Sequence, residues 1–187
     1  FHPISLPVSE RGRAKAELQR HGIDALPILN KRGVITDIVF AGGVDVDNRK
    51  RVDIPVVMMA GGLGTRLYPY TKILPTPLIP VGEQPIADLI IDRFRGFGCH
   101  RFTMVVNYKK GMIKSYFGDL EKDYTREFVD ETQFMGTGGG LCLLKGKVDS
   151  PFFFTNCDTL LDLDFGDLYE KHHERGNLIT MVCALKH

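Results

Sequence analysis

Apolar residues recur with two periods along the chain, and from residue 54 onward the two kinds of segment alternate. Residues 54–59 form a continuous apolar run, typical of a strand buried on both faces, whereas in 84–97 the apolar positions are three or four residues apart and share one helix face. The same periods predict further elements, namely strands at 102–106, 127–129, 151–157 and 178–185, and helices at 110–117, 137–145 and 165–175. Such alternation predicts an α/β fold, a Rossmann-like and mostly parallel sheet with helices on both faces.

The first 45 residues have a different character. A charged stretch between Asp45 and Asp53 contains few apolar residues, which is typical of an exposed connection. Ahead of it the pattern predicts a small α+β segment with a helix at 13–21 and strands at 25–29 and 34–40. We therefore expect three parts, with a segment at 1–45, a linker at 46–53 and a main domain at 54–187.

The segment with the clearest chemistry follows the strand at 54–59. Residues 58–67 read MMAGGLGTRL, so a buried strand leads directly into a glycine-rich turn. Residues without bulky side chains let backbone N–H groups approach an anion, and Arg66 adds a planar positive charge. The P-loop pattern is not met, and the dinucleotide-binding pattern fails because Leu67 stands where a third glycine is required. The turn therefore predicts an anion site that belongs to neither of those classes.

Three motifs in a fixed order resemble the sugar-1-phosphate nucleotidyltransferases. GGLGTRLYPYTKILPTPLIPVGEQPI, from Gly61, resembles the signature G-G-x-G-T-R-L-x-P-x-T-x-x-x-P-K-P. Glu131-Thr132-Gln133 followed by GTGGGL resembles the second nucleotide loop of that family, and 152–158 resembles its apolar strand ending in a metal-binding aspartate. The resemblance covers about 54–187 and is strongest to members related to mannose-1-phosphate guanylyltransferases.

The resemblance implies a GT-A-like nucleotidyltransferase core that moves an NMP from a nucleoside triphosphate, GTP favoured, to a sugar 1-phosphate, with NDP-sugar and pyrophosphate as products. It implies Arg66 and Asp158 as catalytic residues and Asp158 as a ligand of Mg²⁺. The implied nucleotide-binding residues are Ala60, Gly61, Gly62, Gly64, Thr65, Arg66, Gln133 and Gly138. Two alternatives remain open from the residues alone, since Asp158 could cap a following turn and Gln133 could be an ordinary loop residue.

One departure from the signature affects the proposed chemistry. The P-K-P triplet reads Pro75-Thr76-Pro77, so Thr76 stands where the family has a lysine. Losing one preorganised charge at a reacting centre typically costs about 10²- to 10³-fold in rate. Lys72 lies in the same stretch and is a candidate replacement, although it stands four residues earlier. Family members also continue past Leu185, so the resemblance implies that 54–187 is the nucleotide-binding part of a longer domain. The alternative function is a non-catalytic nucleotide-binding or regulatory module.

The N-terminal segment and the composition add further expectations. GIDALPILNKRGVITDIVF resembles the second half of a CBS motif, but Phe40 is followed by Ala41-Gly42-Gly43 rather than by ribose-binding Thr and Asp, which favours a structural remnant that forms a homo-oligomer. The net charge of +1 indicates no nucleic-acid partner, and no apolar run reaches the ~20 residues of a membrane span. Four cysteines without C-x-x-C spacing argue against zinc and favour the cytoplasm.

Overall fold

The computed structural model describes residues 4–41 and 50–184. The chain divides into two compact units, residues 1–48 and 49–187. Each unit is described by itself. Part of the expected linker, residues 46–49, lies outside the described residues.

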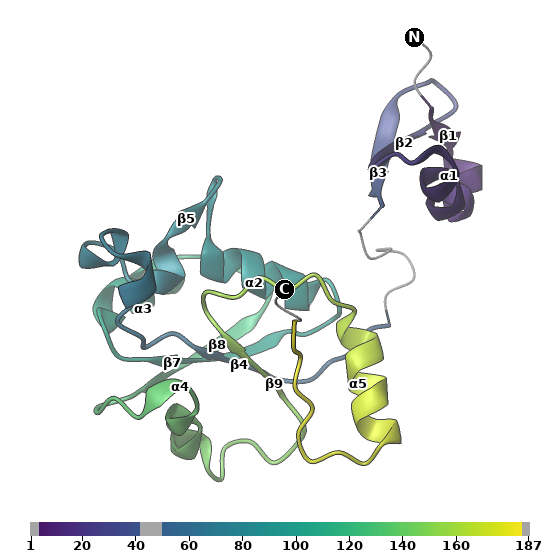
Figure 1. The fold of residues 1–187 in the computed structure, drawn as a ribbon. Coiled ribbons are helices and arrows are strands. Elements are labelled where there is room, and N and C mark those ends of the chain that lie inside the picture. The colour runs from purple at the N-terminus through teal and green to yellow at the C-terminus, as the bar shows by residue number, and fades with distance from the viewer. Residues whose placement is uncertain (1–3, 42–49, 185–187) are drawn as a thin grey trace. The chain divides into compact units, whose positions relative to one another are not determined.

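The N-terminal unit is a three-stranded sheet with one helix against it (Figure 1). Strand β2 (Ala25–Leu29) lies between β1 (Leu6–Pro7), to which it is parallel, and β3 (Ile35–Phe40), to which it is antiparallel. A 3-10 turn (Val8–Arg13) leads into α1 (Ala14–His21), which ends at Gly22 in the left-handed conformation. The core of this unit consists of Ala14, Leu18, Leu26, Ile28 and Val39. The predicted helix and both strands are present, and the helix and the second strand each begin one residue later than predicted.

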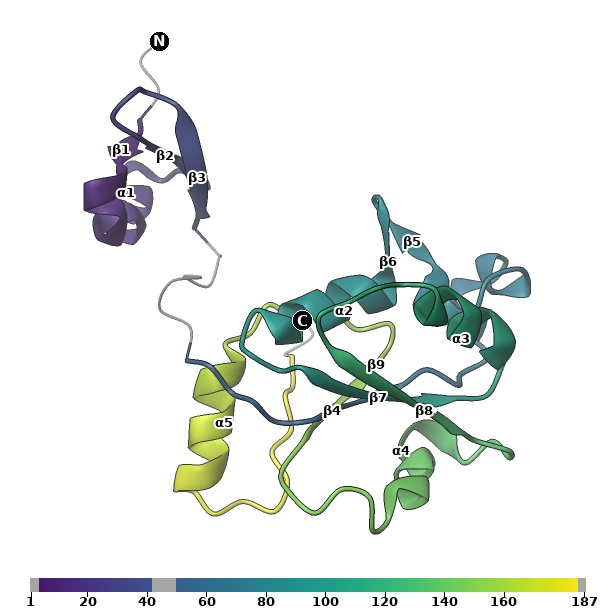
Figure 2. The same cartoon turned by 180° about the vertical axis from the view of Figure 1, so that it is seen from behind.

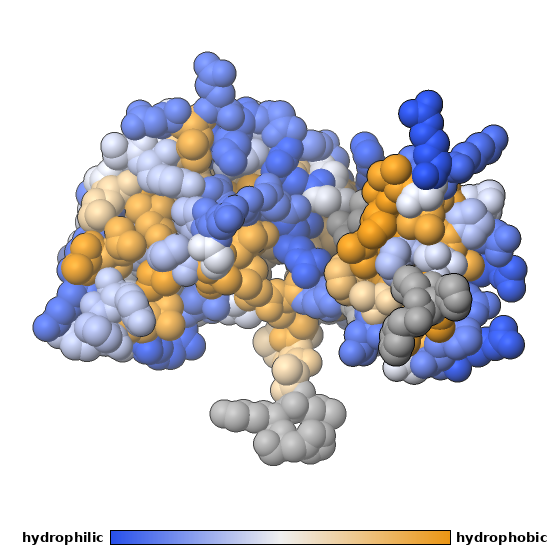
Figure 3. Space-filling model, turned by 90° about the horizontal axis from the view of Figure 1, so that it is seen from above, coloured by the Kyte–Doolittle hydropathy of each residue, from blue (hydrophilic) through white to orange (hydrophobic). Residues whose placement is uncertain are grey.

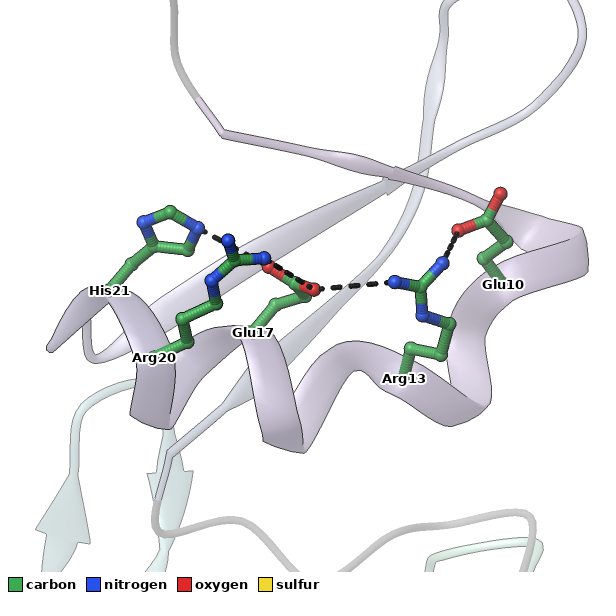
Figure 4. Close-up of polar contacts among 5 residues, drawn as sticks. All are labelled: Glu10, Arg13, Glu17, Arg20 and His21. Atoms are coloured by element: carbon green, nitrogen blue, oxygen red, sulfur yellow. Dashed lines mark hydrogen bonds and ion pairs between the residues drawn. The ribbon is translucent and has the colours of Figure 1, made fainter.

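The outer surface of this unit carries both charged and apolar side chains. Figure 4 shows Glu17 of α1 between Arg13, Arg20 and His21, with Arg13 also paired to Glu10. Ion pairs at the surface each contribute at most about 1 kcal/mol, so the apolar core makes the larger contribution to stability. Apolar side chains also reach the surface of the molecule (Figure 3), among them Ile38 and Phe40 of β3.

The second unit is built on a four-stranded parallel sheet in the order β8-β7-β4-β9 (Figure 2). The strands are β4 (Val56–Met59), β7 (Arg101–Val106), β8 (Thr125–Asp130) and β9 (Phe153–Asn156). Helices α2 (Ile86–Arg95) and α3 (Lys110–Gly118) lie on one face, and α4 (Gly136–Gly139) lies on the other. The predicted fold class, a parallel α/β sheet covered on both faces, is confirmed.

Two apolar clusters join these layers. On the α4 side, Val57, Val105 and Val129 pack with Leu144 of the 3-10 helix Gly140–Leu144. On the α2 side, the ring of Phe94 stacks on Phe165, with 4.3 Å between ring centroids, and lies 5.3 Å from Phe153 of β9. Phe165 begins α5 (Phe165–Glu174), whose first turn is capped by Asp164 through a bond from the Asp167 amide. These contacts fix the helices on the sheet and leave the carboxyl ends of the strands for the loops.

Three sequence predictions require correction. No strand forms between 178 and 184, where Leu178 is 98% exposed, because an apolar pattern produces a strand only when a neighbouring strand accepts its hydrogen bonds. The helix predicted from 84 begins at Ile86, because β6 (Gln84–Pro85) pairs with β5 (Pro80–Val81) in a hairpin. The helix predicted at 137–145 is one α-helical turn followed by a 3-10 helix, in a stretch with four glycines at 136 and 138–140.

Candidate functional site

A cavity of about 260 Å³ opens at the carboxyl ends of the parallel strands. Its lining comes from the glycine-rich loop after β4, from the loop after β8, from the end of β9, and from Thr76. Crossovers in a parallel sheet bring the loops that follow the strands to one edge, which is where such folds bind ligands. The three sequence motifs, separated by up to about a hundred residues, therefore meet around one cavity.

The glycine-rich loop, whose Gly61, Gly62 and Gly64 line this cavity, has main-chain donors that the rest of the described chain does not use. Within the part of the chain that the structure describes, the N–H groups of Gly61, Gly62, Leu63 and Gly64 have no hydrogen-bond partner. Ala60 differs, because its N–H donates to the carbonyl of Val105 at 2.8 Å and the residue is fully buried. The predicted donor role of this loop is therefore available to the glycines, whereas Ala60 acts as a continuation of the strand.

Gly64 forms the tightest turn of the loop. Its φ of +66° lies in the left-handed region, and an added Cβ would stand 2.3 Å from Thr76 Oγ1 and 2.5 Å from Thr71 Cγ2. The Thr71 hydroxyl also donates to the Gly64 carbonyl at 2.9 Å. Both the conformation and the close approach of the two threonines require glycine at this position.

Arg66 and Asp158, the two predicted catalytic residues, are brought together. Nη2 of Arg66 lies 2.5 Å from Oδ2 of Asp158, and both side chains line the cavity. The Asp158 carboxylate accepts from the Thr159 hydroxyl at 3.3 Å, and the residue does not cap a helix, since Asp164 does so for α5. Asp158 thus lines the cavity, and its role as a metal ligand stays a prediction.

The cation that could replace the missing lysine is not at the cavity. Lys72 does not line it, and its Nζ lies 4.8 Å from the ring centroid of Tyr68. Thr76 does line the cavity and is 4% exposed. The position of the family's lysine is therefore part of this site, but a neutral side chain occupies it.

The loop after β8 contributes a residue that the sequence interpretation left without a role. Glu131 directly follows β8, is 4% exposed and lines the cavity together with Phe134 and Thr137. Its carboxylate accepts from the Met135 amide at 3.1 Å and from Asn107 Nδ2 at 3.5 Å. Gln133 and Gly138, predicted to meet the base, are not among the lining residues. Glu131 directly follows a strand, and this position at the carboxyl end of β8 could have indicated it as a site residue.

Two residues that follow β7 donate hydrogen bonds to the segment that contains Thr71 and Thr76. Lys109 has a left-handed φ of 50°, unusual for a residue with a Cβ, and its Nζ donates to the carbonyls of Lys72 and Ile73. Tyr108 OH donates to the Thr71 carbonyl at 3.2 Å. The end of β7 is thereby linked to Thr71 and, through Thr71, to Gly64. The sequence carries no motif for this link.

The cavity contains one thiol and one carboxylate at its β9 end. Burial raises the pKa of Cys157 to about 12, so at neutral pH this thiol is protonated and is a poor nucleophile. Within residues 4–41 and 50–184, no group of three or more His, Cys, Asp or Glu side chains could hold a metal ion by itself. A hard cation at Asp158 would therefore take its remaining ligands from a bound substrate and from water, as Mg²⁺ commonly does.

Comparison with known proteins agrees with this geometry. Residues 55–187 match the family described as "Nucleotidyl transferase". The chain belongs to this nucleotidyl transferase family. The prediction made from the three motifs is confirmed, whereas the match leaves the first 54 residues untouched, and the CBS-like character of that segment stays a prediction.

Curated relatives of the nucleotidyl transferase domain include the mannose-1-phosphate guanyltransferases of Aspergillus oryzae, 35% identical over 133 residues, and Candida albicans, 34% identical. The matched region is 68% of this chain, and the chain spans 36–37% of the length of these two relatives.

Solved structures of similar fold include HddC from Yersinia pseudotuberculosis complexed with GMP-PN, at 27% identity and a TM-score of 0.57 over 64% of this chain and 54% of that one. Another is UDP-glucose pyrophosphorylase from Acinetobacter baumanii, at 16% identity and a TM-score of 0.55, and the match covers 67% of this chain and 54% of that one. The second likeness shows the fold alone.

Proposed function

We propose that this chain forms the nucleotide-binding part of a sugar-1-phosphate nucleotidyltransferase that takes GTP and a sugar 1-phosphate and resembles mannose-1-phosphate guanylyltransferases. The observation that carries the proposal is the convergence of unpaired glycine N–H groups, Arg66 and Asp158 on one cavity. Such a set of donors and charges suits a polyphosphate, and the mannose-1-phosphate guanyltransferases among the relatives support the guanylyl and hexose assignment.

The proposed reaction requires positioning more than covalent chemistry. An oxygen of the sugar phosphate attacks the α-phosphorus of the triphosphate, and pyrophosphate leaves in line. The guanidinium of Arg66 would bind the β- and γ-phosphates, and the N–H groups of Gly61 to Gly64 would bind phosphate oxygens, so that charge growing on pyrophosphate is neutralised. Asp158 would hold Mg²⁺ through a carboxylate oxygen. That ion, when bound, would supply positive charge that helps neutralise the phosphates.

Glu131 supports the preference for guanine. Guanine presents two adjacent donors, N1–H and the N2 amino group, on its base-pairing edge, and a carboxylate accepts both. A carboxylate has about four acceptor sites, and the Glu131 carboxylate uses two of them within the protein. Glu131 follows β8 and Asp158 follows β9, which are the two edge strands of the four-stranded sheet. Neighbouring strands are about 4.8 Å apart, so the ends of these two strands are separated by roughly 14 Å. Base and phosphates would thus bind at opposite ends of the cavity.

The proposal also covers the cellular compartment of the protein and its binding partners. We expect a cytoplasmic protein without nucleic-acid partners, which the four unpaired thiols support, and a homo-oligomer formed through the N-terminal unit. Of the described helices, none has the length and apolar character needed to cross a membrane. A second candidate function, a nucleotide-binding module without catalysis, is favoured by the neutral Thr76 at the cavity wall.

Calorimetric titration of the chain with GTP, ATP, CTP and UTP in Mg²⁺ tests the proposal. GTP should bind at least ten-fold more tightly than the other triphosphates, and Glu131→Gln should remove most of that difference, since a bidentate pair discriminates by about 1–3 kcal/mol. Glu127→Gln is the matched control, because Glu127 is an exposed residue of β8 paired with Lys147. Absence of binding to every triphosphate would sink the proposal. Formation of GDP-mannose from mannose 1-phosphate would then exclude the non-catalytic module.

A further inference from the structure

Thr76 carries a buried hydroxyl that has no hydrogen-bond partner. The residue is 4% exposed and Oγ1 makes no hydrogen bond in the part of the chain that the structure describes. Two other buried polar atoms there share this condition, on Arg95 and Tyr124, and neither of those residues lines the cavity, whereas Thr76 does. A buried hydroxyl without a partner destabilises a fold, so it calls for an explanation.

The neighbouring Thr71 shows that the lack of a partner is particular to position 76. Both threonines lie against Gly64, and the Thr71 hydroxyl donates to the Gly64 carbonyl at 2.9 Å. The Thr76 hydroxyl stands beneath the same glycine, where an added Cβ would approach it to 2.3 Å, and finds no acceptor. The local main chain thus satisfies one hydroxyl and leaves the other with its donor unused.

The unused donor lies at the anion-binding end of the cavity. Gly64 directly precedes the 3-10 turn Thr65–Leu67, which carries Arg66. Threonine has staggered rotamers about χ1, and a rotation of about 120° moves its hydroxyl into the position that the methyl group or the hydrogen on Cβ held. Thr76 lines the cavity, and a rotation about χ1 reorients its hydroxyl without moving the main chain.

We propose that the Thr76 hydroxyl is a ligand-binding donor that turns into the cavity and bonds a phosphate oxygen of the bound nucleotide. The proposal rests on the proposed function, since it takes the occupant of the cavity to be a nucleoside triphosphate. Among the described lining residues Arg66 is the cation, and Thr76 adds a neutral donor beside it. The Thr76 hydroxyl would then lower the stability of the unliganded protein and strengthen the binding of the ligand.

The test is Thr76→Val, which keeps the branched shape and removes the hydroxyl, with Thr76→Ser restoring it. Thr125→Val is the matched control, at an exposed residue of β8 that does not line the cavity. Affinities for GTP with Mg²⁺ and for guanosine are measured by calorimetry, and the melting temperature without ligand is measured by scanning calorimetry. We expect Thr76→Val to weaken GTP by ten-fold or more and guanosine by less than two-fold. Thr76→Ser should stay within about three-fold for GTP, and the melting temperature of Thr76→Val should be unchanged or raised by about 2–4 °C.

The outcomes separate the inference from the function on which it rests. If GTP binds the unaltered chain and Thr76→Val binds it equally well, the inference is wrong and the proposed function stands. If Thr76→Val lowers the melting temperature and weakens guanosine as much as GTP, the hydroxyl has a structural role and the inference is again wrong. If no nucleoside triphosphate binds the unaltered chain, both the function and the inference fail.

Discussion

The guanidinium of Arg66 lies 2.5 Å from the carboxylate of Asp158, across the open edge of the sheet from the loop after β4 to the end of β9. The side chain of Arg66 is 81% exposed and that of Asp158 is 20% exposed. In the proposed reaction each group has another partner, phosphate for the arginine and a divalent cation for the aspartate. In that reaction, substrate binding would exchange this ion pair for two stronger charge-assisted contacts.

Replacing Arg66 should remove most nucleotide binding. Arg66→Ala deletes a charge-assisted contact worth roughly 1.5–3 kcal/mol, so we expect GTP affinity to fall at least ten-fold in calorimetry. Lys72→Ala is the matched control, because it removes the same charge from an exposed residue of the same segment that does not line the cavity. Unchanged affinity in Arg66→Ala would contradict the phosphate assignment.

Replacing Asp158 should uncouple nucleotide binding from the metal. Without metal, Asp158→Asn frees Arg66 and removes a negative charge from the cavity, so GTP affinity in EDTA should rise about two- to five-fold, the range set by up to about 1 kcal/mol for an exposed ion pair. Addition of Mg²⁺ should strengthen GTP binding to the unaltered chain and leave the variant little changed. Asp162→Asn is the control, since Asp162 is an exposed partner of Arg93 outside the cavity lining. Equal strengthening by Mg²⁺ in both proteins would argue against Asp158 as the metal ligand.

Substitution of Gly64 should destabilise the domain. Gly64→Ala places a Cβ 2.3 Å from Thr76 Oγ1 at a φ of +66°, so strain and overpacking combine to about 2–4 kcal/mol. Thermal denaturation should show a clear loss for Gly64→Ala and a small change for Gly62→Ala, where an added Cβ meets nothing within 4 Å. Equal melting temperatures for the two variants would show that the turn at Gly64 is not a constrained one.

Removal of the N-terminal unit should leave nucleotide binding intact. All described residues that line the cavity fall between 59 and 158, so deletion of residues 1–45 should change GTP affinity by less than about two-fold, ~0.4 kcal/mol. Sedimentation should show a changed oligomeric state if the exposed Ile38 and Phe40 of β3 cover one another in a homo-oligomer. Stabilisation of the intact chain by AMP, absent after the deletion, would instead identify the unit as a ligand sensor.

The amino-acid sequence by itself determined the family and the parallel α/β fold, and it singled out Arg66 and Asp158, whose catalytic roles stay predictions. These follow from local patterns, since strand and helix periods, a glycine-rich turn and an apolar run ending in aspartate are all encoded within short segments. The strand expected at 178–185 does not form across 178–184. A strand requires hydrogen bonds to a neighbouring strand, and the local sequence of the segment does not specify that partner.

Only the tertiary structure decided which residues share the cavity. Glu131 and Thr76 face it, while Lys72, Gln133 and Gly138 do not, and no spacing in the sequence distinguishes these two groups. The difference arises where separate loops meet at the sheet edge. Gly64 packs against Thr76, and Lys109 donates hydrogen bonds to the carbonyls of Lys72 and Ile73. Both contacts join segments that are distant in the sequence. Local sequence sets the conformation of each loop, and the packing of loops against one another sets which side chains reach a ligand.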